Sequence, residues 1–159
     1  MKSIRSILLI MACISFVMVI GGGAYEHLNI IPRWKLAPPA SLSMFQGEYG
    51  IDEGRFWKLI HPVTLVLMLA SLIANWKTAR KKYILVSLIG YFLVLLITAV
   101  YFVPELLSII HTPYQPVTDN NPVARAGTWE TLSLIRMIFV IGFAGVLLSA
   151  LTKGNEQRA

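Results

Sequence analysis

Four ionisable residues stand inside or directly beside long apolar stretches of this sequence, and they are the residues that could do chemistry. Arg136 and His61 lie within such stretches, and Glu26 and Glu105 follow the ends of two others. An ionisable group costs about 2.5–3.5 kcal/mol at the centre of a membrane span, so it needs a function or a partner. Arginine and histidine could bind or polarise a substrate oxygen while a glutamate accepts a proton. The candidate catalytic residues are therefore His61, Arg136, Glu26 and Glu105.

Tryptophans precede two of these residues at regular spacing. Trp57 precedes His61 by four residues and Thr64 by seven. The same interval of seven leads from Trp129 to Arg136. Residues four and seven apart lie on one face of an α-helix, so each tryptophan should share a face with the polar residues that follow it. Four aromatic residues beside the ionisable groups are candidates for binding a substrate: Tyr25, Trp57, Tyr101 and Trp129.

Each candidate also has a structural interpretation. Arg136 could reach the membrane interface or clamp two helices together, and His61 could bond a backbone carbonyl. Glu26, His61 and Glu105 together could bind iron, manganese or zinc. None of them has the close spacing of the H-E-x-x-H or E-x-x-H motifs. The sequence therefore predicts no metal ligands, and it leaves the cofactor open.

The composition determines which elements must position these residues. Of the 159 residues, 56% are hydrophobic and 14% are charged, against about 25% charged in a typical soluble domain. A soluble domain this small could not bury so much apolar surface. Four stretches reach the length of roughly 20 residues that a helix needs to cross a bilayer, and they cover residues 4–24, 56–76, 83–103 and 132–151. These stretches lack the alternation of a barrel strand.

The sequence thus predicts an all-α integral membrane protein, a four-helix bundle of up-down-up-down topology. Residues 1–159 form one transmembrane domain with outer loops at 25–55 and 104–131. These loops contain many prolines and aromatic residues, which favours a lid over the outer end of the bundle rather than two free linkers. The aromatic residues in them are Tyr25, Trp34, Phe45, Tyr49 and Tyr114.

The lysines and arginines predict the orientation, because they gather in cytoplasmic segments. Eight flank the spans on one side: Lys2, Arg5, Lys77, Arg80, Lys81, Lys82, Lys153 and Arg158. Five are spread over the outer loops: Arg33, Lys35, Arg55, Lys58 and Arg125. Both termini should then be cytoplasmic, in a bacterial inner membrane, and the net charge of +6 reports topology rather than nucleic-acid binding. Cleavage of the first span as a signal peptide would place the mature termini on opposite sides.

The two halves of the chain follow a similar pattern. Each crosses outward, carries a glutamate at the outer end (Glu26, Glu105) and returns behind a tryptophan. A duplicated hairpin would give this pattern, and so would the chance recurrence of interfacial tryptophan and glutamate. Arg136 lies too deep to stay unpaired, and Glu130 on the same helix faces elsewhere. We therefore expect Arg136 to point into the bundle and to meet Glu26 or Glu105 within reach of His61.

Short motifs over most of the chain resemble the anthrone-oxygenase-like family of small membrane proteins. They are Ala24-Tyr25-Glu26-His27, Pro32-Arg33-Trp34, Phe56-Trp57, Phe102-Val103-Pro104, and Trp129 followed after six residues by Arg136. The fungal members of that family are associated with cofactor-independent oxygenation of polyketide anthrones. The resemblance would place four residues in the functional site: Trp57, His61, Trp129 and Arg136.

Two functions remain open at this point. The first is an oxidoreductase-like membrane protein that takes a flat apolar substrate, such as a quinone or polyphenol, from the bilayer. The second is a non-enzymatic accessory subunit that binds a partner membrane protein, with the polar residues holding the helices together. A transporter or channel is disfavoured, because the inner halves of the spans contain few polar residues to line a path.

Overall fold

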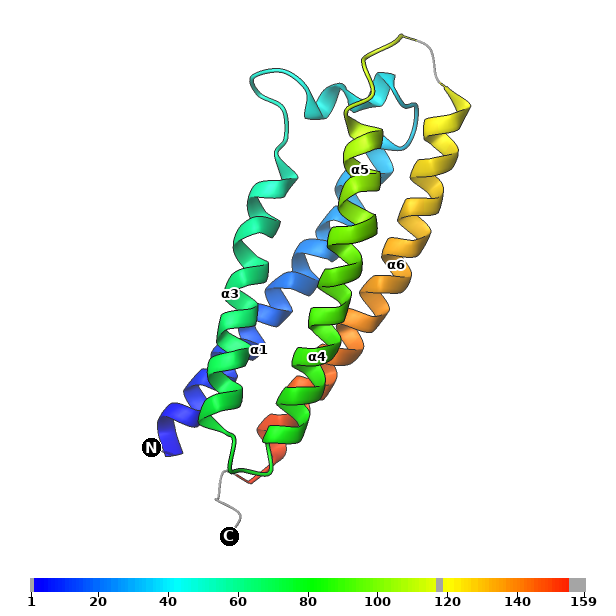
Figure 1. Ribbon diagram of the computed structural model, residues 1–159. Helices are drawn as coiled ribbons and strands as arrows, with labels where there is room; N and C mark the ends of the chain where they lie inside the picture. The colour runs from blue at the N-terminus through cyan, green and yellow to red at the C-terminus, as the bar shows by residue number, and fades with distance from the viewer. Residues whose placement is uncertain (1, 117–118, 155–159) are drawn as a thin grey trace.

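The computed structural model describes residues 2–116 and 119–154, and the regular structure of these residues is entirely helical (Figure 1). Within these described residues, four helical segments are long and apolar enough to cross a membrane: Ser3–Trp34, Gly54–Ala74, Lys81–Ile110 and Asn120–Thr152. They run side by side as alternating up and down helices. This arrangement confirms the predicted all-α, four-helix membrane architecture.

The first and third segments each contain several helical elements in series. The first consists of α1 (Lys2–Tyr25), a π-helical turn η1 (Glu26–Ile30) and α2 (Ile31–Trp34). The third consists of α4 (Lys81–Ile97), a π-helical turn η3 (Thr98–Phe102) and α5 (Val103–Ile110). The second is α3 (Glu53–Ala74), and the fourth is α6 (Asn120–Ser149) with the 3₁₀ turn η4 (Ala150–Thr152). A further 3₁₀ turn, η2 (Ala40–Phe45), lies between α2 and α3.

The bundle packs as two closely associated helix pairs, α1 with α3 and α4 with α6. Glycine permits the close approach in each pair. A Cβ atom on Gly90 would lie 2.2 Å from the ring of Phe143, and one on Gly22 would lie 2.5 Å from the ring of Phe56. The opposite faces of the helices expose large apolar side chains, as a lipid-facing surface requires.

The helices extend further, and the loops are shorter, than the sequence predicted. The first and third segments continue to Trp34 and Ile110, and the fourth begins at Asn120. Most of the predicted outer loop 104–131 is therefore helical. The prediction counted Pro32, Pro104 and Pro122 as loop residues. Pro122 lies in the first turn of α6, where proline is tolerated because the N–H at that position has no partner anyway. Pro32 and Pro104 each follow a π-helical turn by two residues, and the helix continues through both of them.

The π-helical turns occupy corresponding places in the two halves. Both are five residues long, and Glu26 and Thr98 begin them 72 residues apart. The Ile31 N–H bonds the Glu26 carbonyl, and the Val103 N–H bonds the Thr98 carbonyl, five residues back in both cases. The same offset of 72 relates Trp57 to Trp129 and Thr64 to Arg136. In this frame Glu26 corresponds to Thr98, whereas the predicted alignment matched it with Glu105.

The segment between α2 and α3 packs across one end of the bundle, which we call the loop end. Trp34 and Leu42 are fully buried there in one apolar cluster with Ile109 and Trp129. The Asp119 N–H donates to the Pro38 carbonyl at 2.9 Å and so joins the two connections. The predicted cover over this end is confirmed for these residues. Its outlying aromatics stay exposed: Tyr49 (93% exposed) and Tyr114 (57%).

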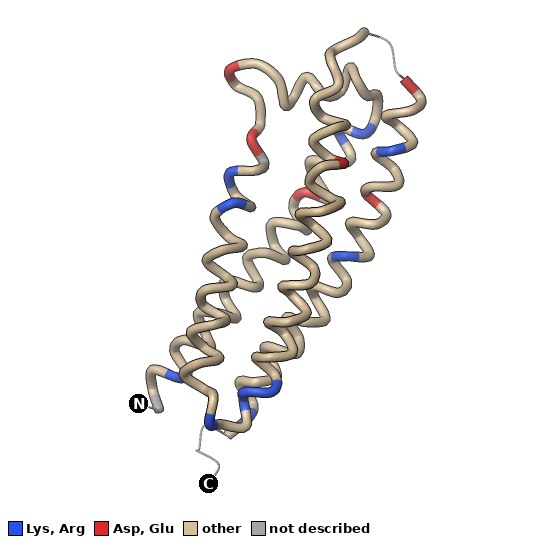
Figure 2. The backbone as a smooth tube through the Cα atoms, in the orientation of Figure 1, with Lys and Arg blue, Asp and Glu red and all other residues tan. Residues whose placement is uncertain are grey.

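The described chain begins and ends at the opposite end, which we call the terminal end (Figure 1). Lysines and arginines lie at both ends of the bundle, whereas the described acidic residues lie toward the loop end, so the terminal end carries only positive charge among the described residues (Figure 2). This separation matches the charge pattern of the sequence. Arg158, which the topology argument counted, lies outside the described residues. The side of the membrane that each end faces stays a prediction.

Candidate functional site

Arg136 projects from the middle of α6 into the bundle, as predicted. Its Nη1 donates to Thr98 Oγ1 at 3.0 Å, and its Nη2 donates to Ser133 Oγ at 2.8 Å. The guanidinium also lies over the ring of Phe102, 4.2 Å from the ring centroid. Thr98 and Phe102 are the first and last residues of η3, so the π-helical turn supplies two of the three contacts.

Glu26 reaches the same region from the first helical segment. The Trp57 Nε1–H donates to Glu26 Oε1 at 2.5 Å. Glu26 lies near enough to Arg136 for the two charges to interact, but the described contacts include no direct ion pair between them. The Glu26 carboxylate therefore stabilises the positive charge of Arg136 through space, while the N–H groups of Arg136 bond other residues.

His61 stands beside both groups, one helical turn after Trp57 on α3. Its imidazole stacks on Trp57 with ring centroids 5.0 Å apart and an interplanar angle of 20°. Its Nδ1 shares a hydrogen bond of 2.7 Å with the Tyr91 hydroxyl from α4. The charge of Arg136 acts on His61 as well as on Glu26. The described contacts hold no hydrogen bond or ion pair that joins Arg136 to Glu26 or to His61, so the predicted direct meeting of these groups stays a prediction. Of the two glutamates, Glu26 is the one whose charge acts on Arg136.

Hydroxyl groups continue this cluster toward the middle of the bundle. Tyr91 and Thr64 are both fully buried, and Thr64 lies about one turn after His61 on α3. Thr64 Oγ1 in turn shares a hydrogen bond of 2.6 Å with Ser15 Oγ of α1. Sequence reasoning missed Tyr91 because its partner His61 lies on another helix, although Tyr91 precedes Thr98 by seven residues on its own helical segment. The available signal was a tyrosine deep in an apolar span, since a buried tyrosine hydroxyl needs a partner.

All four membrane-spanning segments thus contribute to one site, which we call the Arg136 cluster. Its members are Glu26, Trp57, His61, Tyr91, Thr98, Phe102, Ser133 and Arg136. Tyr91, Phe102 and Ser133 are buried. Glu26, Trp57, His61 and Arg136 are only partly buried, so part of each of these residues lies at the surface of the bundle.

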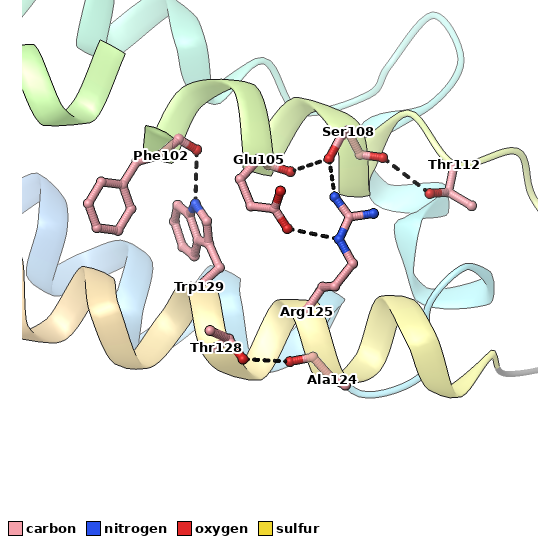
Figure 3. Close-up of polar contacts among 8 residues, drawn as sticks. All are labelled: Phe102, Glu105, Ser108, Thr112, Ala124, Arg125, Thr128 and Trp129. Carbon is pink, nitrogen blue, oxygen red and sulfur yellow. Dashed lines mark hydrogen bonds and ion pairs between the residues drawn. The ribbon is translucent and has the colours of Figure 1, made fainter. Parts of the chain in front are cut away.

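The other predicted site residues lie elsewhere. Glu105 accepts a hydrogen bond of 2.8 Å from Arg125 Nε, and Arg125 also donates to the Ser108 hydroxyl (Figure 3). The predicted alternative in which Glu105 meets Arg136 is therefore wrong, because a nearer arginine on α6 pairs with this glutamate. Tyr25 is 59% exposed and Tyr101 is 40% exposed, so neither is a buried member of the site.

Trp129 supports the site without facing it directly. Its Nε1–H donates to the Phe102 carbonyl at 2.9 Å, which fixes the residue whose ring lies under Arg136 (Figure 3). Glu130, the neighbour of Trp129, forms an ion pair with Lys35 and so faces away from Arg136, as predicted. The contact with Lys35 ties the cover at the loop end to α6, the helix that carries Arg136, and the contact with Phe102 ties η3 to the same helix.

The residues weighed for a metal site do not come together. Glu26 and His61 lie in the Arg136 cluster, whereas Glu105 belongs to the pair with Arg125. Among residues 2–116 and 119–154, no group of three or more histidine, cysteine, aspartate or glutamate side chains could hold a metal ion. The chemistry that the described cluster offers is hydrogen bonding, charge stabilisation and proton transfer.

The arrangement is suited to an oxygen atom on a flat apolar molecule. Arg136 uses two of its five N–H donors in the described contacts, and the rings of Phe102 and Trp57 provide apolar surface beside it. His61 has its Nδ1 engaged by Tyr91, and Glu26 carries a carboxylate oxygen that Trp57 does not bond. Known protein families, curated proteins and solved structures offer no match to this chain.

Proposed function

We propose that this integral membrane protein is an oxidoreductase of the oxygenase type that binds a flat, oxygen-bearing aromatic molecule at the Arg136 cluster. A quinone or a polyphenol is a molecule of this kind. The observation that carries the proposal is the position of Arg136 and the kind of hydrogen-bond partners that it has. It is a guanidinium inside a membrane-spanning helix, and its direct hydrogen-bond partners in the described chain are two neutral hydroxyls.

The free donors of Arg136 give the site its ligand preference. Arg136 has N–H groups beyond those that bond Thr98 and Ser133, and a ligand oxygen that accepts one of them forms a hydrogen bond to a charged group, which contributes about 1.5–3 kcal/mol. A carbonyl or phenolate oxygen fits the charge, and the arginine would stabilise it most when it becomes anionic. The rings of Trp57 and Phe102 favour an aromatic body attached to that oxygen.

Glu26 and His61 supply a base close to the bound oxygen. In an anthrone-type substrate, a base removes one proton from the ring methylene, and the resulting carbanion is stabilised as an oxyanion by Arg136. Dioxygen accepts the electrons, and the methylene becomes a quinone carbonyl with release of one water molecule. The sequence resemblance to anthrone-oxygenase-like proteins agrees with this reaction and remains part of the proposal.

The rival function is that of an accessory subunit, in which the cluster only joins helices. The contacts of Glu26 with Trp57 and of Arg136 with Thr98 do cross between helices, and this favours a structural contribution. Such a role needs no ligand. The two functions therefore differ in whether an added quinone or phenol binds at Arg136.

A binding measurement with two matched arginine variants separates these functions. The detergent-purified protein is titrated with menadione and with an anthrone, and the quenching of tryptophan fluorescence is recorded. Arg136→Met should weaken binding about tenfold or more, since one charge-assisted hydrogen bond contributes about 1.5–3 kcal/mol. Arg125→Met removes an arginine of the same helix and should leave binding unchanged, because Arg125 pairs with Glu105.

Oxygen uptake with the anthrone then tests the reaction itself. We expect uptake by the wild-type chain and by Arg125→Met, and loss of uptake in Arg136→Met. If no ligand binds, or if both arginine variants bind equally well, the proposal fails and the accessory-subunit interpretation is favoured.

A further inference from the structure

The turn between α3 and α4 at the terminal end carries a second concentration of charge, separate from the Arg136 cluster. Lys77, Lys81 and Lys82 stand within six residues, and Trp76 and Tyr83 border them. The Lys81 Nζ lies 3.6 Å from the centroid of the Trp76 ring, and the Lys82 Nζ lies 5.1 Å from that of Tyr83. These contacts hold two of the ammonium groups beside aromatic rings.

Two buried polar side chains, Thr78 and Arg80, hold the backbone of this turn in place. Thr78 and Arg80 are buried, at 5% and 7% exposed, although both are polar. The Thr78 hydroxyl donates to the Asn75 carbonyl at 2.9 Å. Arg80 donates to the Lys153 carbonyl at 3.1 Å and to the Ser6 hydroxyl at 3.0 Å. Arg80 thus joins the turn to both ends of the described chain, and the three lysines are displayed on a rigid base.

An open pocket lies on the outer side of the turn. Its volume is about 480 Å³, and its lining consists of Trp76, Lys77, Thr78, Ala79, Lys81 and Lys82. In the described part of the chain no aspartate or glutamate lies at this end, so none of the lysines has a carboxylate partner there (Figure 2). The pocket combines three unneutralised cations with room for an anionic group.

The surroundings of the pocket favour a lipid over a soluble anion. Trp76 is 51% exposed, and Ile73, one turn earlier on α3, is 67% exposed. An exposed tryptophan next to an exposed apolar helix face is typical of the boundary between headgroups and acyl chains. A phosphate in the pocket would lie beside the lysines while its acyl chains lie along the apolar face of α3.

We propose that the pocket of the Trp76–Lys82 turn binds the phosphate headgroup of an anionic phospholipid. Lysines near a membrane surface each contribute about 1 kcal/mol to binding anionic lipid, which is about fivefold in affinity. The aromatic contacts of Lys81 and Lys82 reduce the freedom that these side chains lose on binding. The proposal is independent of the chemistry at Arg136.

Native mass spectrometry of the full chain in detergent tests the proposal with two lipids of identical acyl chains. Wild-type protein should bind phosphatidylglycerol about tenfold or more tightly than phosphatidylcholine. The site variant replaces the three pocket lysines: Lys77→Gln, Lys81→Gln and Lys82→Gln. A charge-matched control replaces three exposed cations at the loop end: Arg33→Gln, Arg55→Gln and Lys58→Gln. The preference should disappear in the site variant and persist in the control.

Single variants at Lys81 keep the test decisive if the triple variant does not fold. Lys81→Gln should lower the preference about fivefold, whereas Lys81→Arg keeps both the charge and the stacking on Trp76 and should retain it. Equal losses in the site and control variants would overturn the proposal, as would a wild-type chain without preference. Displacement of the lipid by millimolar inorganic phosphate would identify a soluble-anion site instead and would also overturn it.

Discussion

Arg136 is stabilised by a set of partial contacts rather than by one strong ion pair. Two hydroxyls accept its N–H groups, an aromatic ring lies under its plane, and the Glu26 carboxylate acts through space. Removing one member of a fully buried ion pair costs about 3–5 kcal/mol because the other charge is stranded. Since Glu26 and Arg136 are both partly exposed, the corresponding cost here should be smaller.

A double-mutant cycle between Glu26 and Arg136 measures this coupling. Arg136→Met should lower the free energy of unfolding by about 1–3 kcal/mol, because it leaves the Glu26 charge without its counter-charge. Adding Glu26→Gln should recover part of that loss, whereas adding Glu105→Gln should recover none, because Glu105 pairs with Arg125. Thermal unfolding in detergent gives the change in stability of the single variants and of both double variants. Strict additivity of Arg136→Met and Glu26→Gln would contradict the proximity on which the site depends.

The Tyr91 hydroxyl fixes His61 through its Nδ1. Tyr91→Phe should destabilise the protein by about 0.5–1.5 kcal/mol, the usual net contribution of one hydrogen bond. It should also change the ¹⁵N chemical shifts of the His61 ring. The hydrogen bond at Nδ1 helps to determine which ring nitrogen carries the proton, and this variant removes that bond. Tyr114→Phe removes an exposed hydroxyl and serves as the control. Unchanged His61 shifts in Tyr91→Phe would show that the two side chains do not interact.

At the scale of elements, the sequence predicted the existence and order of the four spans but not where they end. Hydropathy locates the apolar stretches, and the helical face shared by Trp57 and His61 follows from their spacing alone. The extensions to Trp34 and Ile110 were missed because Pro32 and Pro104 were counted as loop residues. The π-helical turns leave no trace in hydropathy, since they differ from an α-helix only in which carbonyl each N–H bonds.

Gly90 controls the approach of α4 to α6. A methyl group there would overlap the Phe143 ring, so Gly90→Ala should lower stability by about 1–3 kcal/mol, the usual cost of overpacking. Gly21 has open space around its Cβ position, and Gly21→Ala should be neutral or slightly stabilising. Melting temperatures of the two variants provide the comparison. Recovery of Gly90→Ala by Phe143→Leu would confirm the contact, and a neutral Gly90→Ala would refute it.

At the scale of the whole molecule, the partners of Arg136 depend on how four helices are placed against one another. Sequence spacing relates residues on one helix, so it could not decide between Glu26 and Glu105 as the acid near Arg136. It also could not indicate that Arg125 pairs with Glu105. Tyr91 and Thr98 were missed for the same reason, since the residues that they contact, His61 and Arg136, lie on other helices.

The topology predicted from the lysines and arginines can be tested by cysteine labelling. In a Cys13→Ser background, single cysteines at Gly154 and Asn120 should react with impermeant reagents from opposite sides of the membrane. Both residues are exposed: Asn120 begins α6 at the loop end, and Gly154 follows η4 at the terminal end. Gly154 should be reached only from the cytoplasm. Labelling of both cysteines from one side would refute the four-span topology.

The π-helical turn at Glu26 also determines how tolerant this chain is to changes in length. A turn with one extra residue rotates every later side chain by about 100° relative to an uninterrupted α-helix. Trp34, which lies beyond η1, depends on that rotation to reach the cluster that it shares with Trp129. A single-codon deletion within residues 26–30 would leave the composition and hydropathy of the span almost unchanged, yet it would turn Trp34 away from its partners and detach the cover from the bundle.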